Sequence, residues 1–349
     1  MFLCCWHSTL ETLKTLALTV FVIYIAIPVV VKTNPWILNK LIFLHFVKFP
    51  FFDDFNDPKK KGIKGTTNFY ITVNEKVKLG TWHVLPEDLQ EKEGDHEEML
   101  KSGHPVVLYL HGNAHTRAQA HRVELYKILS SMNLHVIAID YRGFGDSTGI
   151  PSEPGVLEDT YEAYKWIKER CQDASLYIWG HSLGTAISTN LVKFLNGKGE
   201  YIDGLILESP FNNLRDAALH HPLSLPFRFL PWFEWTFIES FKDAGIDFNT
   251  DENIKNIDEP VLILHAEDDH IIPFECGRKL HESTLQSKNG DTDKVHFKTF
   301  ERKLGYRHND IYRAPELPNI IRKENTVNIP QVRTTHYGLH SLRYAGATL

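Results

Sequence analysis

Short, continuous apolar runs alternate with longer amphipathic stretches through most of this chain, and this alternation constrains the fold more than any other feature. The apolar runs are Val106–His111, His135–Tyr141, Leu176–Gly180, Leu205–Ser209, Val261–Glu267 and Val295–Phe300. A strand buried on both faces is apolar throughout, and strands that alternate with helices form a parallel sheet with helices on both faces. The sequence therefore predicts an α/β fold with a mostly parallel central sheet, preceded by antiparallel strands at Thr67–Val73 and Lys76–Leu85.

One interval, between Glu208 and Pro260, is longer than a single crossover helix requires. It contains the sequence LSLPFRFLPWFEWTFIESF, which is rich in Phe and Trp. An insert above the carboxyl ends of parallel strands can cover a ligand crevice. We therefore predict a lid insert over residues 212–257, in which Phe227–Phe241 lines a pocket, touches a bilayer or simply packs the lid.

The sequence Gly180-His181-Ser182-Leu183-Gly184 lies between an apolar run and an amphipathic stretch. A Gly-x-Ser-x-Gly sequence between a strand and a helix is typical of a nucleophile elbow, a strained turn that exposes the serine hydroxyl. The helix that follows directs its positive end toward a developing oxyanion. The same pattern also occurs in plain turns, so the interpretation requires a base and an acid elsewhere in the chain.

The base and the acid have candidates in the expected order. A serine nucleophile needs a base that a third group orients, and in this fold class the order along the chain is Ser, acid, His. Asp269 and His308 each follow one of the apolar runs, so both are expected at the carboxyl end of a strand. Asp269 is preferred over Asp268 because it is the fifth residue counted from His265, the place of the acid in the hydrolase pattern His-Gly-x-x-Asp-x-x-Val-Pro. We predict Ser182, Asp269 and His308 as the catalytic residues.

An acyl-transfer site also needs hydrogen-bond donors for the oxyanion. One donor is expected to be the backbone N–H of Leu183, next to the nucleophile. The other is expected in the sequence YLHGNAHT, where the turn at His111 and Gly112 would direct the backbone N–H of Asn113 into the crevice. His111 itself is interpreted as structural.

The amino-terminal region is apolar in a different way. Thr15–Val31 carries no charge and is bounded by Lys14 and Lys32. A membrane-spanning helix needs about 20 apolar residues, with about 17 as a lower limit. We predict a single membrane anchor here; a signal peptide is the alternative, but no small-x-small cleavage site follows. Trp36–Phe52, which contains aromatic residues and lysines, is predicted to be an interfacial segment.

Charges and cysteines beside the anchor bear on its orientation and attachment. Lysines lie mostly after the apolar run, which by the positive-inside rule keeps the following domain in the cytosol. No Asn-x-Ser/Thr sequon occurs in the chain. Cys4 and Cys5 precede the run and are weak candidates for palmitoylation.

Several function classes find no support. The net charge of -6 gives no general footprint for nucleic acid. The four cysteines form no disulfide framework, and neither CxxC nor HExxH is present to suggest a metal site. Gly143 and Gly145 lack the third glycine of a dinucleotide-binding GxGxxG. We expect no metal, no cofactor and no nucleic-acid partner.

Taken together, several motifs resemble the α/β-hydrolase-domain proteins of the type-12 subfamily, which are membrane-bound monoacylglycerol and lysophosphatidylserine lipases. These motifs are YLHGNAHTR, DYRGFGDSTG, YIWGHSLGTAISTNLV, LILESPFNN, LILHAEDDHIIPF and LGYRHNDIYRAPELP. The resemblance covers the chain from about Tyr24 to Pro318. It implies an α/β-hydrolase fold and a serine hydrolase of single-chain lipids, with the triad on Ser182, Asp269 and His308.

The chain departs from this resemblance in two places. His115 stands where the family usually has glycine, beside the expected oxyanion loop. From Glu324 onward the chain matches no pattern of the family. The resemblance also implies the endoplasmic reticulum membrane and a catalytic domain in its lumen, whereas the lysines favour the cytosol, so the side of the membrane stays open.

The predicted organisation has four parts: an anchor with an interfacial segment (1–52), a polar linker (53–66), an α/β-hydrolase domain (67–323) and an atypical tail (324–349). The predicted function is hydrolysis of the ester of a monoacyl lipid, such as lysophosphatidylserine or monoacylglycerol, with a membrane-borne single-chain lipid as the binding partner. The alternatives are acyl transfer on the same triad and non-catalytic, membrane-tethered lipid binding.

Overall fold

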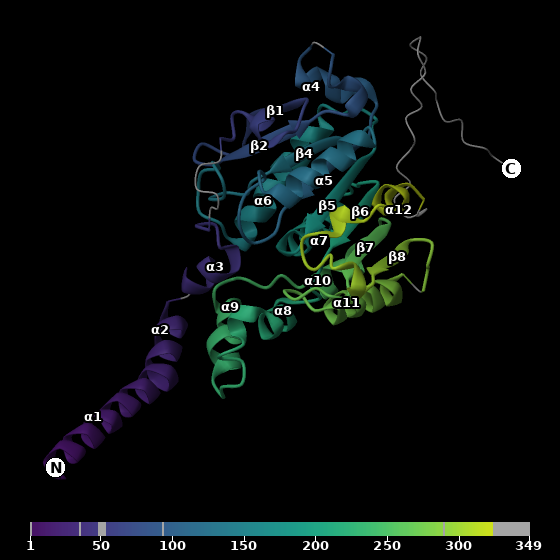
Figure 1. Ribbon diagram of the computed structural model, residues 1–349. Coiled ribbons are helices and arrows are strands. Elements are labelled where there is room, and N and C mark those ends of the chain that lie inside the picture. Colours follow the sequence, from purple (N-terminus) through teal and green to yellow (C-terminus); the bar gives the residue numbers. More distant parts are fainter. Residues whose placement is uncertain (1, 35, 48–53, 93, 289, 324–349) are drawn as a thin grey trace.

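An eight-stranded sheet forms the centre of the computed structural model, which describes residues 2–34, 36–47, 54–92, 94–288 and 290–323. In spatial order the strands are β1 (Thr66–Thr72), β2 (Lys78–Val84), β4 (His135–Ile139), β3 (Val106–Leu110), β5 (Leu176–His181), β6 (Gly204–Glu208), β7 (Val261–Ala266) and β8 (Val295–Phe300). β1 and β2 pair antiparallel and β2 pairs antiparallel with β4, while all the other pairs are parallel (Figure 1). The predicted fold class is confirmed, and the predicted tail at 324–349 lies outside the described residues.

Helices cover both faces of this sheet, because successive side chains of a strand point to opposite faces. On one face Leu108 and Ile178 belong to a buried cluster with side chains of the helices at Glu153–Lys168 and Leu183–Asn196, and on the other Tyr109 and Trp179 belong to a cluster with side chains of the helix at Ala120–Ser131. The helices that follow β2 are α4 (His96–Met99), α5 (Ala120–Ser131), α6 (Glu153–Lys168), α7 (Leu183–Asn196), α8 (Leu214–His220), α9 (Glu239–Asp243), α10 (Thr250–Asn253), α11 (Phe274–Ser287) and α12 (Leu317–Lys323). The carboxyl ends of β3, β5, β7 and β8 thus lie along one edge, where the loops that follow them can meet.

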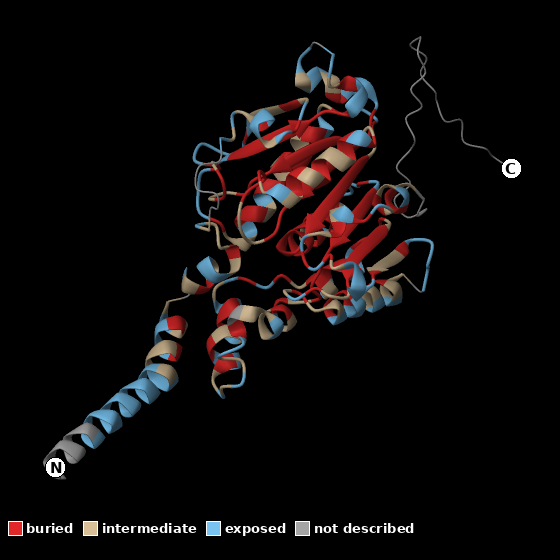
Figure 2. Cartoon of the chain, in the orientation of Figure 1, coloured by how far each residue is buried: buried red, intermediate tan, exposed pale blue. Residues whose placement is uncertain are grey.

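A long helix precedes the sheet. α1 (Phe2–Phe21), a π-helical turn (Val22–Ala26) and α2 (Ile27–Thr33) follow one another without a break. Its segment Thr9–Thr33 has 25 residues and, within the described ranges, is the one helix long and apolar enough to cross a membrane. Figure 2 shows α1 exposed along its described length, whereas the central strands are buried. The side chains of Cys4 and Cys5, the palmitoylation candidates, lie outside the described residues.

A short helix, α3 (Trp36–Phe43), follows the anchor and packs into the core. Leu38 and Phe43 are fully buried, and the Phe43 ring contacts the rings of Phe144 and Phe248 edge-on. The prediction for this stretch was an interfacial segment alone, and its residues 48–52 lie outside the described residues. An apolar helix beside a membrane looks the same in sequence whether lipid or protein covers it, and here protein covers one of its faces.

The insert between β6 and β7 lies beside the anchor. It contains α8, a π-helical turn (Glu234–Ile238), α9 and α10. Lys32 Nζ at the end of α2 lies 2.7 Å from Asp243 Oδ2 at the end of α9, and 5.5 Å from the ring centroid of Trp235. Figure 1 shows α9 on the side of the sheet from which α2 extends.

Candidate active site

Ser182 occupies a sharp turn between β5 and α7. Its φ of 53° lies in a region that residues with a side chain rarely adopt. Two close approaches make the turn possible: a Cβ added to Gly180 would lie 2.4 Å from the carbonyl oxygen of Gly184, and one added to Gly184 would lie 2.0 Å from the carbonyl oxygen of Leu110. The flanking glycines of the motif are therefore required by backbone contacts, as expected for a nucleophile elbow.

The structure brings Ser182, His308 and Asp269 together. His308 Nε2 lies 3.0 Å from Ser182 Oγ, and His308 Nδ1 lies 2.7 Å from Asp269 Oδ2. All three residues are buried. They come from the loops after β5, β7 and β8, so each side chain reaches the same point from a different strand end.

Asp269 is held on both of its oxygens. Oδ1 accepts hydrogen bonds from the backbone N–H groups of Ile271 and Ile272 at 2.8 and 2.9 Å. Burial by itself would raise the pKa of Asp269, but His308 and His265, whose Nε2 lies 3.5 Å from Oδ2, hold that pKa well below its usual value. The carboxylate is therefore ionised at neutral pH, as a group that orients and stabilises an imidazolium must be.

Two residues that the sequence analysis did not assign hold the backbone of His308. His181 Nε2 donates to the carbonyl oxygen of His308 at 3.0 Å, and Ser209 Oγ donates to the same oxygen at 3.3 Å. Burial, together with the nearby charge of His308, lowers the pKa of His181 to about 3. His181 therefore stays neutral beside His308. The only sequence signal for a role of His181 was its place directly before Ser182, and no sequence signal pointed to Ser209.

The residues predicted for the oxyanion lie beside the nucleophile. Asn113 and Leu183 both line the cavity that contains Ser182. A Cβ added to Gly112 would lie 3.2 Å from Ser182 Cβ, so the turn before Asn113 packs directly against Ser182. The N–H of Leu183 belongs to the first turn of α7, where the helix dipole favours negative charge.

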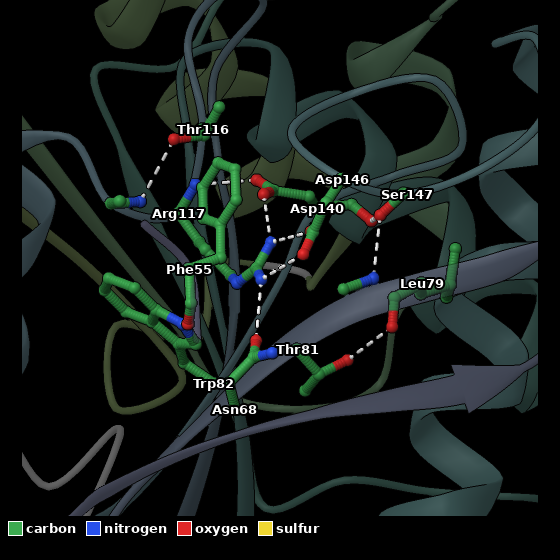
Figure 3. Close-up of polar contacts among 12 residues, drawn as sticks. Phe55, Asn68, Leu79, Thr81, Trp82, Thr116, Arg117, Asp140, Asp146 and Ser147 are labelled. Carbon is green, nitrogen blue, oxygen red and sulfur yellow. Dashed lines mark hydrogen bonds and ion pairs between the residues drawn. The ribbon is translucent and has the colours of Figure 1, made fainter. Parts of the chain in front are cut away.

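Buried arginines fix the loop that carries Asn113. Arg122 donates to the backbone carbonyls of Thr116 at 2.7 Å and Ala114 at 2.8 Å. Figure 3 shows Arg117 between Asp140 and Asp146; its Nη1 lies 2.5 Å and 2.7 Å from their carboxyl oxygens. The backbone N–H of Arg117 also donates to Asp140, at 2.6 Å.

Arg117 is fully buried, and aromatic rings enclose it. Its guanidinium carbon lies 4.4 Å from the ring centroid of Phe55 and 5.5 Å from that of Trp82 (Figure 3). Burial would lower the pKa of Arg117, but Asp140 and Asp146 raise it above its usual value. A buried charge is tolerated only when it is paired and hydrogen-bonded, so this group is a fixed point behind the oxyanion loop.

His115 adopts a φ of 63°, within the left-handed region. This accounts for the glycine that the resembling family usually has there, since glycine adopts such a φ without strain. The backbone N–H of His115 donates to the carbonyl oxygen of Val47 at 3.2 Å. The segment after α3 therefore reaches the oxyanion loop.

A cavity of about 360 Å³ opens at Ser182. Its walls are mainly aromatic and aliphatic side chains of the lid insert, together with Leu41 and Ile42 of α3, which the sequence analysis did not foresee. Among the described lining residues His221 is the one His, Asp, Glu, Lys or Arg, and burial lowers its pKa. The volume falls within the range of small-molecule sites, roughly 300–1,000 Å³. An apolar chain attached to an ester at Ser182 fits such a cavity.

Asp268, the neighbouring carboxylate that was not chosen as the acid, makes a different contact. Asp268 Oδ1 accepts a hydrogen bond from the backbone N–H of Arg307 at 3.0 Å, which holds the loop that carries His308. The preference for Asp269 therefore agrees with the geometry. Within the described residues, no three His, Cys, Asp or Glu side chains gather as a metal site would require.

Comparisons with known proteins give close relatives. A family described as "alpha/beta hydrolase fold" matches residues 105–242. The chain is 50% identical over 304 residues to lysophosphatidylserine lipase ABHD12 of Danio rerio, covering 86% of this chain and 80% of that protein. The match to lysophosphatidylserine lipase ABHD12 of Rattus norvegicus is 48% identical and covers 89% and 79%. Protein ABHD12B of Homo sapiens is 40% identical over 82% of this chain and 79% of its own length.

Solved structures agree on the fold. An α/β hydrolase from Vibrio vulnificus superposes with a TM-score of 0.58 at 18% identity, covering 79% of this chain and 88% of that one. The esterase Pf2001 of Pyrococcus furiosus gives a TM-score of 0.54 at 19% identity, covering 75% and 88%. At such low identity these likenesses concern the fold alone.

Proposed function

Because the chain belongs to the ABHD12 family of α/β hydrolases, we propose that it is a lipase that cleaves the ester of monoacyl lipids, with lysophosphatidylserine as the foremost substrate class and monoacylglycerol as the second. One observation carries the chemistry. Asp269, His308 and Ser182 form a continuous hydrogen-bonded chain that ends in the wall of an apolar cavity. This arrangement favours catalysis over non-catalytic lipid binding, because lipid binding does not require an aligned base and acid.

The first half of the reaction forms an acyl-enzyme. His308 Nε2 takes the proton of Ser182 Oγ as that oxygen attacks the carbonyl carbon of the ester. The oxyanion that results is bound by the backbone N–H groups of Leu183 and Asn113, each worth roughly 3–4 kcal/mol of transition-state stabilisation. The intermediate then collapses, the bond to the glycerol oxygen breaks, and His308 returns the proton to that oxygen.

Water completes the cycle. His308 Nε2 takes a proton from a water molecule that attacks the acyl carbon, and the second tetrahedral intermediate releases the fatty acid as the proton returns to Ser182 Oγ. Asp269 keeps the Nδ1–H of His308 pointed toward itself throughout, which leaves Nε2 free to accept a proton in each half-reaction. Throughout, the acyl chain occupies the cavity.

The apolar lining of the cavity favours the binding of an acyl chain inside the cavity, with the head group of the lipid outside it. Among the described residues that line it there is no Lys, Arg, Asp or Glu, so a charged serine phosphate would remain near the solvent or the bilayer surface. The apolar helix Thr9–Thr33 supports a membrane location. By analogy with the subfamily, we place the protein in the endoplasmic reticulum membrane. Its parts would be a single-pass anchor with an interfacial segment (1–52), a linker (53–66) and a hydrolase domain (67–323).

A fluorophosphonate probe tests the nucleophile. The full chain in membranes should be labelled at Ser182 and should release fatty acid from lysophosphatidylserine, and Ser182→Ala should abolish both. Ser131→Ala is the control, since its hydroxyl lies at the surface and donates to Ile128. Equal labelling of Ser182→Ala and the native chain would refute the assignment. Adding glycerol as a competing acceptor separates hydrolysis from acyl transfer, because transfer would yield monoacylglycerol in place of free fatty acid.

A further inference from the structure

The helix that follows the membrane anchor takes part in the catalytic cavity. Leu41 and Ile42 of α3 line the cavity that contains Ser182. Leu41 is 40% exposed and so lies at the rim of the cavity, while Ile42 is partly buried against the core. A segment that merely connected the anchor to the domain would leave no side chain in the cavity wall.

Other contacts fix α3 in this position. Leu38 and Phe43 are fully buried, and Asn39 Nδ2 donates to the carbonyl oxygen of Pro151 at 2.8 Å. Beyond the helix, the carbonyl oxygen of Val47 accepts the backbone N–H of His115 at 3.2 Å. The segment is therefore fixed at both ends, to the domain core and to the oxyanion loop.

The membrane anchor contacts the lid insert that lines the cavity. Pro28 and Val31 of α2 are buried, and Lys32 pairs with Asp243 at 2.7 Å and lies over Trp235. These lid residues are close in sequence to Phe237 and Phe241, which line the same cavity as Leu41 and Ile42. The cavity is thus formed by α3 and by the lid insert, and the membrane anchor contacts one end of that insert.

We propose that α3 is part of the acyl-binding site, and that Leu41 and Ile42 select the length of the acyl chain that the cavity accepts. This inference rests on the proposed function, because it assumes that an acyl chain occupies the cavity. The physical basis is steric. A residue in a cavity wall that gains or loses several carbon atoms changes the space left for the chain, and one methylene group in an apolar pocket changes discrimination by roughly 10–200-fold.

The test uses the full chain in membranes and a series of lysophosphatidylserines from lauroyl to arachidoyl. Ile42→Trp should shift the ratio of kcat/KM toward the shorter chains, and Ile42→Ala toward the longer ones, each by roughly tenfold. The controls are Val30→Trp, which adds the same indole on an exposed face of α2, and Trp36→Ala, on the exposed face of α3. Both controls should keep the native profile.

Labelling by a short fluorophosphonate shows whether each variant still presents an active Ser182. If both Ile42 variants are labelled at the native rate and keep the native chain-length profile, the inference is wrong. If the native chain is neither labelled nor active, the proposed function fails instead.

A second measurement does not depend on turnover. The Ser182→Ala chain is incubated with a monoacyl lipid that carries a diazirine in its acyl chain, irradiated and digested. Cross-links within residues 36–47 support the proposal, and cross-links confined to the lid insert overturn it.

Discussion

Replacing Asp269 by Asn should disable catalysis while leaving the fold intact. Asp269 Oδ1 accepts two backbone N–H groups, from Ile271 and Ile272. An Asn side chain keeps these bonds only if its carbonyl oxygen takes the place of Oδ1, which turns its NH₂ group toward His308 Nδ1. Two donors cannot face each other, so His308 would shift its proton to Nε2 and could no longer accept a proton from Ser182.

The magnitude follows from this tautomer change. The equivalent replacement in a serine protease leaves the geometry intact and lowers kcat by about 10⁴-fold through the wrong tautomer. Because the two backbone donors enforce the same amide orientation here, we expect a loss of about 10³–10⁴-fold, or about 4–5.5 kcal/mol at 1.36 kcal/mol for each factor of ten. The KM should change little, since Asp269 does not line the cavity.

The assay measures kcat for lysophosphatidylserine hydrolysis and the rate of fluorophosphonate labelling, with thermal unfolding as the check on the fold. Asp268→Asn is the matched control, because an amide oxygen can still accept the N–H of Arg307 and this residue makes no contact with His308 Nδ1. The reasoning would be refuted if Asp269→Asn kept more than about a tenth of the native kcat, or if both variants lost activity equally.

Three further outcomes are expected. His181→Phe removes a hydrogen bond of about 1–1.5 kcal/mol to the His308 carbonyl and should lower kcat roughly tenfold. His181→Gln can still donate this hydrogen bond and should recover much of the lost kcat. Identical kcat values for the two variants would contradict a positioning role. Arg117→Met leaves Asp140 charged and buried and should lower the free energy of unfolding by about 3–5 kcal/mol in denaturant titrations. Arg278→Met at the surface should have little effect. Equal changes in the free energy of unfolding for the two variants would contradict the role of the buried ion pair. Burial and neighbouring histidines hold the pKa of His83 well below its usual value and that of His135 at about 3. Below about pH 6.5 the unfolded chain therefore gains protons that the folded chain does not, and stability should fall as the pH falls, by about 1.4 kcal/mol per pH unit for His135 down to about pH 3 and in the same direction for His83. A thermal midpoint that is constant from about pH 7 to 5 would contradict this.

The fold could be predicted from the sequence because burial on both faces makes each central strand apolar throughout. The runs around Leu108, Ile178 and Ile263 therefore stand out without any knowledge of tertiary structure. The order of Ser182, Asp269 and His308 was also readable, since the parallel topology carries each strand end to the same edge of the sheet.

Other features depend on contacts between distant residues and leave no local pattern. The apolar side of α3 would satisfy a bilayer as well as a protein core, so the burial of Leu38 and the place of Ile42 in the cavity were not readable. The contact between His181 and the His308 carbonyl depends on the conformation of a loop far along the chain. The φ of His115 could have been inferred only from the glycine that the family usually has there.

The close approaches around the elbow restrict how this protein can change over evolutionary time. Most tight contacts in a core join two side chains, and a larger group on one side can be accommodated by a smaller one on the other. Gly184 faces the carbonyl oxygen of Leu110, and Gly180 faces that of Gly184. Every amino acid carries the same carbonyl group, so no second substitution can make room for a methyl group at either position. The two glycines are therefore fixed independently of the substrate, and a descendant that had lost Ser182 and all activity would still need them to keep β5 and α7 together.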